Sequence, residues 1–204
     1  MIIRCATADD AAALASVERE SWPDGLAGSE SDCRARINTF SNGQLLIEEN
    51  GRIIAVCSAQ RISRQQLFQA QTYDAITDSG RFAATHDANG DVYQLVGVAV
   101  ARRFQGLNLG RRLVDEQITR ARSMDGIKRI VGFTRPVAFH KFPDRDIESY
   151  VATHNGSGIP VDPVLAFHLT AGAKIVSLHA NFRPKDAQAR GYGILIEYPL
   201  RAEG

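Results

Sequence analysis

The chain has 204 residues, of which 44% are hydrophobic and 23% charged, and its formal net charge at pH 7 is +1. This composition excludes a disordered or fibrous protein, and the balanced charge provides no global field that would attract nucleic acid. The three cysteines are scattered without a CxxC pair, which excludes a disulfide framework and a zinc site and fits a reducing compartment. Without a secretion signal or an apolar run near about 18 residues, the sequence predicts a cytoplasmic protein with no membrane span.

The first part of the chain predicts a strand, two helices and a β-hairpin. We expect them over residues 2–6, 9–22, 30–39 and 44–62. Thr7 or Asp9 can cap the first helix, and Asn50 with Gly51 is the strongest short-range signal for a hairpin turn. Residues 63–90 are polar and irregular, so they predict a long loop of the kind that carries function.

The second part predicts a buried strand, a helix, further strands and a short capped helix. The nearly continuous apolar run at 91–100 is typical of a central strand covered on both faces. We expect the elements that follow at 109–124, 127–134, 163–172, 174–180 and 192–200, with a second long loop at 135–161. Asp162 and Pro163 open the late helix and Gly172 follows its end. The order predicts one mixed α/β domain over residues 1–204.

A glycine-punctuated basic loop, "RRFQGLNLGRR" at 102–112, lies between the strand at 91–100 and the following helix. A strand that enters a helix through glycine exposes backbone N–H groups and the positive end of the helix dipole, which together bind phosphate. Gly110 is followed by Arg111 and Arg112 rather than Lys-Ser/Thr, and GxGxxG is absent, so neither common nucleotide fold is favoured. The alternative is a turn whose glycines relieve strain and whose arginines are solvated.

"QGLNLG" closely resembles the Q/R-x-x-G-x-G/A signature of the GNAT acyltransferase superfamily, and the opening "IRCATADDAAALASVE" and the late "FHLTAGAKIV" resemble the same pattern. Asn108 stands where the first signature glycine is usual, and Asn is the residue after glycine that best tolerates left-handed angles. The resemblance implies a single-domain GNAT fold in which the parallel strands 91–100 and 127–134 splay apart around coenzyme A. It assigns cofactor binding to Val98, Ala99, Val100, Gln105, Gly106, Leu107, Asn108, Leu109, Gly110, Arg111 and Arg112.

A narrower likeness concerns the reaction. "TRPVAF", "VDPVLAFHLTAGA" and "FRPKDAQARGYGILIEY" resemble GNAT domains linked to carbon–nitrogen hydrolases and the GNAT-like loading domains of polyketide synthases. This likeness implies that Thr134 and His168 act together on a malonyl-type thioester, and that Trp22 and Arg183 line the acyl pocket or contact the substrate carboxylate. His168 also falls where many GNAT enzymes place the tyrosine that protonates the CoA thiolate. The alternatives are a core histidine and a threonine that simply ends a strand.

Three functions therefore stay open. The first is an acyltransferase that passes an acetyl or acyl group from CoA to an amine or thiol. The second is a malonyl-CoA-type decarboxylase or S-acyltransferase that loads an acyl carrier protein, and the third is an acyl-CoA-binding module without turnover. No spacing of histidine and acidic residues indicates a metal, and we expect neither nucleic acid nor membrane as a partner. The sequence leaves the acceptor, and the choice between monomer and homodimer, open.

Overall fold

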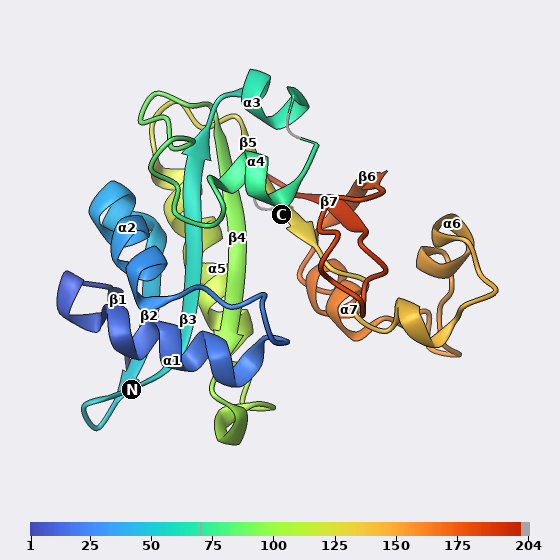
Figure 1. The fold of residues 1–204 in the computed structure, drawn as a ribbon, viewed down its shortest axis with the longest axis horizontal. Helices are drawn as coiled ribbons and strands as arrows, with labels where there is room; N and C mark the ends of the chain where they lie inside the picture. Colours follow the sequence, from blue (N-terminus) through green and yellow to red (C-terminus); the bar gives the residue numbers. More distant parts are fainter. Residues whose placement is uncertain (70, 201–204) are drawn as a thin grey trace. The chain divides into compact units, whose positions relative to one another are not determined.

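The structure is a computed structural model that describes residues 1–69 and 71–200 (Figure 1). Its contacts divide the chain into two units, Met1–Ile130 and Val131–Gly204. The fold class is mixed α/β, as predicted. The single domain over 1–204 and the parting of strands 91–100 and 127–134 stay predictions.

Four antiparallel strands form the sheet of the first unit. They are β1 (Ile2–Cys5), β2 (Gln44–Glu49), β3 (Arg52–Ile62) and β4 (Val92–Val100), and neighbours in this order are hydrogen-bonded. The predicted hairpin turn is confirmed, since Asn50 and Gly51 have φ angles of 50° and 74° between β2 and β3. Paired positive φ angles favour asparagine followed by glycine, because this turn matches the twist of the strands it joins.

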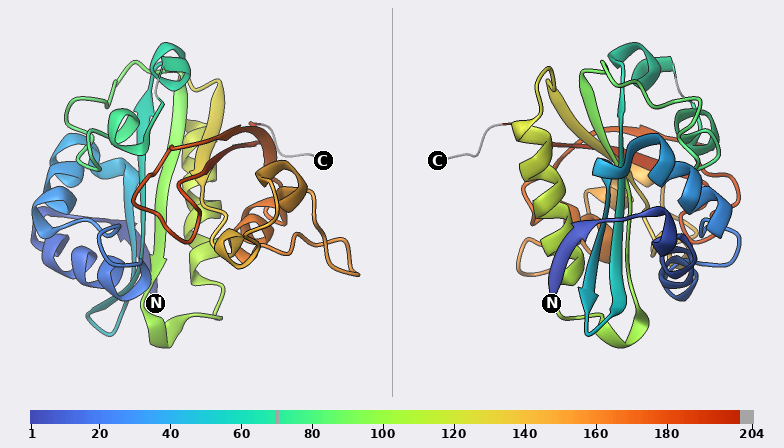
Figure 2. Two further views of the ribbon diagram at one scale, coloured as in Figure 1. Left: turned by 45° about the vertical axis from the view of Figure 1, so that its right-hand side comes forward. Right: turned by 90° about the vertical axis from the view of Figure 1, so that its left-hand side faces the viewer.

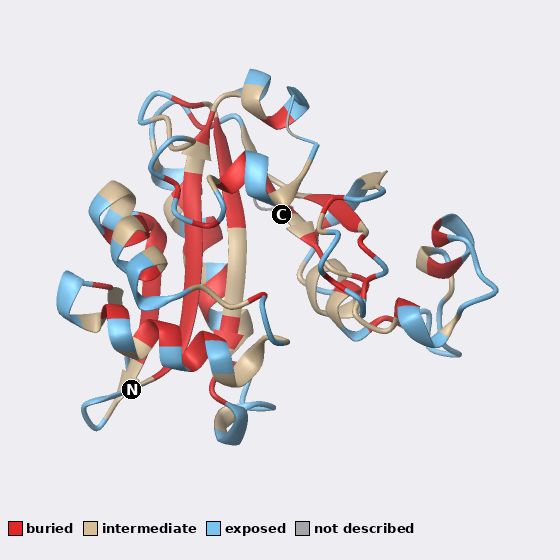
Figure 3. Cartoon of the chain, in the orientation of Figure 1, coloured by how far each residue is buried: buried red, intermediate tan, exposed pale blue. Residues whose placement is uncertain are grey.

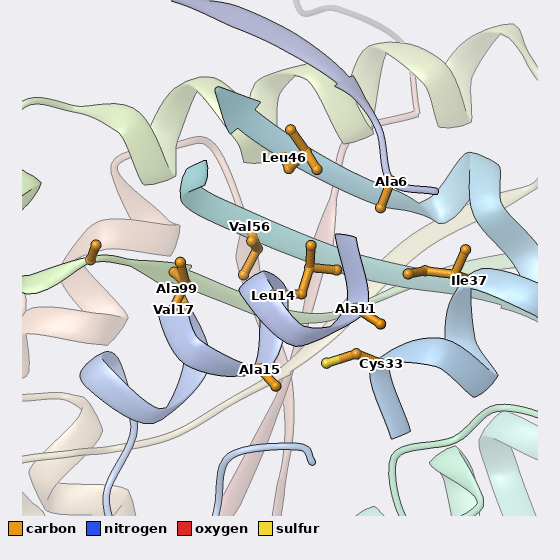
Figure 4. Packing of buried hydrophobic residues seen from close by; sticks show 11 residues of the cluster. Ala6, Ala11, Leu14, Ala15, Val17, Cys33, Ile37, Leu46, Val56 and Ala99 are labelled. Atoms are coloured by element: carbon orange, nitrogen blue, oxygen red, sulfur yellow. The ribbon is translucent and has the colours of Figure 1, made fainter. Parts of the chain in front are cut away.

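Helices cover both faces of this sheet. In the second panel of Figure 2, α1 (Ala11–Ser21) and α2 (Glu30–Phe40) lie on one face and α5 (Leu109–Ser123) on the other. Successive strand residues point to opposite faces, so Leu46 packs with the α1 and α2 side chains while its neighbour Leu45 packs with α5. Figure 4 shows the first of these clusters, and Figure 3 shows that β3 is buried along most of its length and β4 over its first half.

The start of the first helix differs from the prediction. Residues Ala8–Asp10 form a 3-10 turn, η1, with Thr7 as its N-cap, and α1 begins only at Ala11. Asp10 rather than Asp9 makes the capping contacts, because its Oδ2 accepts hydrogen bonds from the backbone N and the Oγ1 of Thr7 at 2.7 and 2.9 Å. Thr7 is thus the N-cap of the 3-10 turn, whereas the N-cap of α1 is Asp10 and not the predicted Asp9.

The segment 63–90 contains more structure than its polar sequence indicates. It forms α3 (Arg64–Gln69) and α4 (Tyr73–Thr77). The Oγ1 of Thr72 caps α4 by accepting a hydrogen bond from the backbone N of Ala75 at 3.1 Å, and Ile76 and Phe82 are buried. A helix this short is stabilised by tertiary packing rather than by its own propensity, so periodicity does not reveal it. Two further 3-10 turns of this unit are η2 (Ser41–Gly43) and η3 (Arg102–Phe104).

The second unit contains most of β5 (Arg129–Thr134), together with β6 (Lys174–His179) and β7 (Gly193–Tyr198), in the strand order β5-β7-β6. Strands β6 and β7 are antiparallel. The long segment before β6 holds η4 (Phe139–Lys141), α6 (Ile147–Val151) and α7 (Pro163–Leu169). The predicted opening of α7 at Asp162 and Pro163 is confirmed, and Gly172 adopts a φ of 90° beyond its end.

Within residues 1–69 and 71–200, no helix combines the length and the apolar character that a membrane crossing requires. In the same residues, no group of three or more histidine, cysteine or acidic side chains is placed to hold a metal ion.

Candidate functional site

Strand β4 carries a β-bulge close to Val98, Ala99 and Val100, which are among the residues predicted to bind the cofactor. In the ladder with β3, Gly97 lies opposite Ser58 and Leu95 opposite Ala59, so one extra residue of β4 is inserted between these pairs. Bulges bend a strand and re-aim its backbone groups, and they are frequent beside active sites. Sequence reasoning missed this feature, although a glycine inside a strand is a signal for a bulge.

Trp22 lies against β4 at this bulge. Its Cζ2 atom is 3.4 Å from the position that a Cβ on Gly97 would occupy, which is van der Waals contact. The preceding residue, Ser21, donates a hydrogen bond from Oγ to the backbone O of Val100 at 2.8 Å. The structure therefore places Trp22 beside the predicted segment Val98, Ala99 and Val100.

The loop from β4 to α5 adopts the left-handed backbone that its sequence requires. Gly106 has a φ of 81°, and a Cβ there would meet nothing within 4 Å. Asn108 has a φ of 57° and a ψ of 17°. The backbone N–H groups of residues 106–110 have no acceptor within the described part of the chain, and the first helical bond runs from Arg112 N to Asn108 O at 3.1 Å. Consecutive unpaired N–H groups at a helix N-terminus form a site for an anion.

Helix α5 is fixed to the sheet by one face and leaves its basic side exposed. Leu109, Leu113, Val114, Ile118 and Ala121 are buried and recur at the spacing of one helical face. The first turn of α5 contains no acidic residue that would satisfy the positive end of its dipole.

The polar side chains of the loop contact other residues of the first unit. Arg111 Nε contacts Asp115 Oδ1 at 2.8 Å, and Arg112 donates a hydrogen bond from Nη1 to the Sδ of Met1 at 2.9 Å. Gln105 donates a hydrogen bond from Nε2 to the Val100 carbonyl at 3.1 Å, so this side chain supports the loop. The guanidinium of Arg103 lies 4.7 Å from the centroid of the Phe104 ring.

Thr134 ends β5 with a polar atom that lacks a partner. The residue is 4% exposed, and its Oγ1 is buried with no hydrogen-bond partner in the described structure. Buried hydroxyls in folded proteins almost always have a partner, and one that lacks it calls for an explanation such as an absent ligand or a catalytic role. The same fact shows that no hydrogen bond joins Thr134 Oγ1 to His168.

Contacts on both sides of Thr134 hold the segment 182–186 along the end of β5. The rings of Phe133 and Phe182 are stacked with centroids 4.1 Å apart. Arg135 forms a bidentate ion pair with Asp186, in which Nη2 lies 2.7 Å from Oδ1. Arg183, a predicted substrate contact, belongs to this segment and donates its backbone N–H to the Gly191 carbonyl at 3.0 Å.

His168 lies on α7 and is held by a tyrosine. Its Nδ1 is 2.5 Å from the hydroxyl of Tyr198 on β7. His168 is partly buried, and the loss of water around its ring lowers its pKa to about 4, because desolvation disfavours the charged form. The imidazole is therefore neutral at pH 7, and it can donate one hydrogen bond and accept one. Sequence reasoning did not find Tyr198, because the two residues are 30 positions apart.

The sequence is similar to known proteins. The family model "Acetyltransferase (GNAT) family" matches residues 11–142. A probable hydrolase, YhcX of Bacillus subtilis (strain 168), is 25% identical over 202 residues, which are 97% of this chain and 38% of that protein. The chain thus spans less than half the length of this relative.

Two solved structures are similar over nearly the whole chain. The loading GNATL domain of CurA from Lyngbya majuscula is 27% identical with a TM-score of 0.89, and the alignment covers 98% of this chain and 97% of that one. The GphF GNAT-like decarboxylase, solved in complex with isobutyryl-CoA, is 30% identical with a TM-score of 0.85 and a coverage of 98% and 100%. This protein therefore belongs to the GNAT acetyltransferase family.

Proposed function

We propose that the protein binds a malonyl-type acyl-CoA and decarboxylates its acyl group. The observation that carries the proposal is the buried hydroxyl of Thr134, which has no partner in the described structure. A substrate oxygen would satisfy this group, and the likeness to a GNAT-like decarboxylase supports a substrate that loses CO₂. His168, neutral because burial lowers its pKa to about 4, is the second group of the site.

The reaction needs stabilisation of negative charge on the thioester oxygen. When the bond between the α-carbon and the carboxylate breaks, CO₂ leaves and the electron pair remains as a thioester enolate. The hydroxyl of Thr134 and an N–H of His168 donate hydrogen bonds to that oxygen, which lowers the barrier because preorganised donors act where charge develops. A proton from water on the α-carbon completes the acetyl-thioester, so the reaction consumes one proton and releases one CO₂.

Coenzyme A is held through its diphosphate by the 105–112 segment. The five unpaired N–H groups from Gly106 to Gly110 and the positive end of α5 support this assignment. Calorimetric titration with desulfo-CoA tests it without any reaction. Binding is expected for the native chain and a loss of about 10-fold or more for Gly106→Val, because a β-branched residue at a φ of 81° distorts the loop. An absence of binding by the well-folded native chain contradicts the proposal.

The decarboxylation is tested by incubation with malonyl-CoA and detection of acetyl-CoA and CO₂ by mass spectrometry. The Thr134→Val and His168→Gln variants are each expected to lose about 100-fold or more in kcat, the usual loss when one oxyanion donor is removed. Thr119→Val is the matched control, since its exposed hydroxyl donates only to the Asp115 carbonyl of its own helix at 2.9 Å. Full activity of Thr134→Val would exclude the proposed role of that hydroxyl.

Acyl transfer to an amine or thiol is the second candidate, favoured by membership of the GNAT family. A neutral His168 can also accept a proton from an incoming nucleophile. Release of CoA from acetyl-CoA in the presence of an amine, without conversion of malonyl-CoA, would support this reaction. Transfer to the thiol of an acyl carrier protein is the variant that the likeness to a loading domain supports, and tight CoA binding with neither reaction would indicate a binding module.

A further inference from the structure

We propose that Tyr198 is a positioning residue that holds His168 in the tautomer whose hydrogen is on Nε2, so that the ring presents a donor rather than a base. This inference rests on the proposed function for its kinetic consequence. The tautomer itself is a property of the unliganded protein and can be measured without any reaction.

The geometry fixes both partners of the contact. Tyr198 is 2% exposed and belongs to β7, while His168 belongs to the last turn of α7. The hydroxyl lies 2.5 Å from Nδ1, and the two rings meet at an interplanar angle of 70° with centroids 6.2 Å apart. The rings therefore touch through the hydroxyl and not through a stacked face. Asp162 holds α7 by accepting hydrogen bonds from the backbone N–H groups of Val164 and Leu165 at 3.0 and 3.1 Å.

The chemistry of the two groups decides the direction of the hydrogen bond. Burial lowers the pKa of His168 to about 4, so the ring is neutral at pH 7 and has one N–H and one lone pair. A phenol is a good donor, and the lone pair of a neutral imidazole is a stronger acceptor than a phenol oxygen. The hydroxyl therefore donates to Nδ1, and the ring hydrogen resides on Nε2, since the partner of one ring nitrogen sets the state of the other.

This tautomer separates the two candidate reactions. A ring with hydrogen on Nε2 can donate to the oxygen of a thioester enolate, as decarboxylation requires. The same nitrogen has no lone pair to take a proton from an attacking amine or thiol, and Nδ1 is occupied by Tyr198. The pair of His168 and Tyr198 thus favours decarboxylation over transfer that depends on a general base.

Nitrogen-15 NMR of histidine-labelled protein at pH 7 tests the tautomer. His168→Gln identifies the His168 signals by their absence. We expect a protonated Nε2 and an unprotonated Nδ1 in the native chain, and in Tyr198→Phe both shifts should move toward the average of a tautomer mixture. Tyr192→Phe is the matched control, because the Tyr192 hydroxyl has no hydrogen bond to a described residue and its ring packs on Phe139. A protonated Nδ1 in the native chain, or unchanged shifts in Tyr198→Phe, overturns the proposal.

Kinetics with malonyl-CoA give the second readout. Tyr198→Phe is expected to lower kcat about 10- to 100-fold with KM within about 2-fold, less than the loss of a direct donor, because it disturbs only the orientation and tautomer of His168. A change in KM alone, with native kcat, would overturn the positioning role. If the native chain does not convert malonyl-CoA, the proposed reaction fails, whereas the NMR result still decides the tautomer.

Discussion

The hydroxyl of Thr134 is costly to the fold where it lies, because a buried donor without a partner loses its hydrogen bonds to water. A purely structural threonine at a strand end would pair its hydroxyl with a neighbouring carbonyl. A threonine that waits for a substrate oxygen has no such partner until the substrate binds. The two roles therefore predict opposite effects of removing the hydroxyl on stability.

Thr134→Val should stabilise the unliganded protein while it slows decarboxylation. Valine keeps the shape and removes the unsatisfied group, so we expect the free energy of unfolding to rise by about 1 kcal/mol, or about 2–4 °C in Tm. Urea and thermal unfolding without ligand measure this change, with Thr119→Val as the control. A loss of about 1 kcal/mol or more would mean that the hydroxyl has a structural partner.

The titration of His168 links stability to pH. Its pKa is about 4 in the folded chain against an ordinary value of 6.5, so between these values the unfolded chain binds a proton that the folded chain does not. Stability is therefore expected to fall by about 1–3 kcal/mol as the pH drops from about 6.5 to about 4. Burial also lowers the pKa values of His86 and His179, so these residues add to the loss of stability at low pH.

Urea unfolding of the native chain and of His168→Gln at a series of pH values measures how much His168 contributes to this loss. Between about pH 6.5 and about pH 4, the free energy of unfolding should fall less steeply in the glutamine variant. Decarboxylation should stay constant from pH 7 down to about pH 5, because the ring keeps the same neutral form over this range. An equal slope in both proteins would contradict the lowered pKa.

Asn108 offers a test of the loop at a single residue. Its left-handed backbone should accept Asn108→Gly with the CoA dissociation constant within about 3-fold, because glycine adopts this region without strain. Asn108→Val should cost about 1–2 kcal/mol of stability and weaken CoA binding about 10-fold or more. Asn50→Val at the β2–β3 turn, where φ is 50°, is the control that introduces similar strain but should keep CoA affinity.

At the scale of elements, α7 depends on one buried carboxylate. Besides capping α7, Asp162 accepts hydrogen bonds through Oδ2 from the backbone N of Ala138 and from the hydroxyl of Tyr150 at 2.9 and 2.8 Å. This carboxylate therefore joins the segment before α6, the helix α6 itself and the helix that carries His168. It is 1% exposed, so water cannot replace any of these bonds.

Asp162→Ala is expected to lower the free energy of unfolding by about 3 kcal/mol or more, because it removes a cap and leaves buried N–H and O–H donors unsatisfied. Asp146→Ala removes the exposed cap of α6, whose Oδ1 accepts a hydrogen bond from Ser149 N at 2.6 Å, and should cost clearly less stability. Urea unfolding compares the two. Equal losses would show that Asp162 is no more than an ordinary helix cap.

Sequence patterns located the elements whose signals agree with one another. The helix predicted at 109–124 is α5 at Leu109–Ser123, because apolar periodicity and the preceding glycine loop both define it. Patterns missed α3 and α4, whose stability comes from packing, and the bulge in β4, which only Gly97 signals. The same is true of the site. The loop residues form a local sequence pattern that could be found, whereas Tyr198 and His168 are distant in sequence and contact each other only in the folded chain.

The environments of Thr134 and His168 could not be predicted from the sequence. Their candidacy came from resemblance, since neither residue has a motif of its own. The structure adds what no pattern contains, namely that one side chain is buried without a partner and the other is neutral and held by a phenol. Such environments depend on side chains that are distant in sequence, and single-residue chemistry cannot predict them.

At the scale of the whole molecule, the net charge of +1 is too small to attract a polyanion such as CoA, so the attraction must come from a local cluster of basic side chains. The 102–112 loop contains such a cluster, formed by Arg102, Arg103, Arg111 and Arg112. CoA at about 100 times its dissociation constant should stabilise the native chain by about 2.7 kcal/mol, and hence raise Tm by about 5–10 °C.

The same binding should weaken as NaCl rises from about 0.05 to about 0.5 M, since exposed charges are screened. Replacing Arg111 and Arg112 together by alanine should lower both the affinity and its dependence on salt, whereas Arg34→Ala, which removes an exposed partner of Glu30, should change neither. Differential scanning fluorimetry with CoA, repeated across the salt series, measures both effects. An equal salt dependence in all three proteins would mean that the backbone N–H groups hold the diphosphate without help from these two arginines.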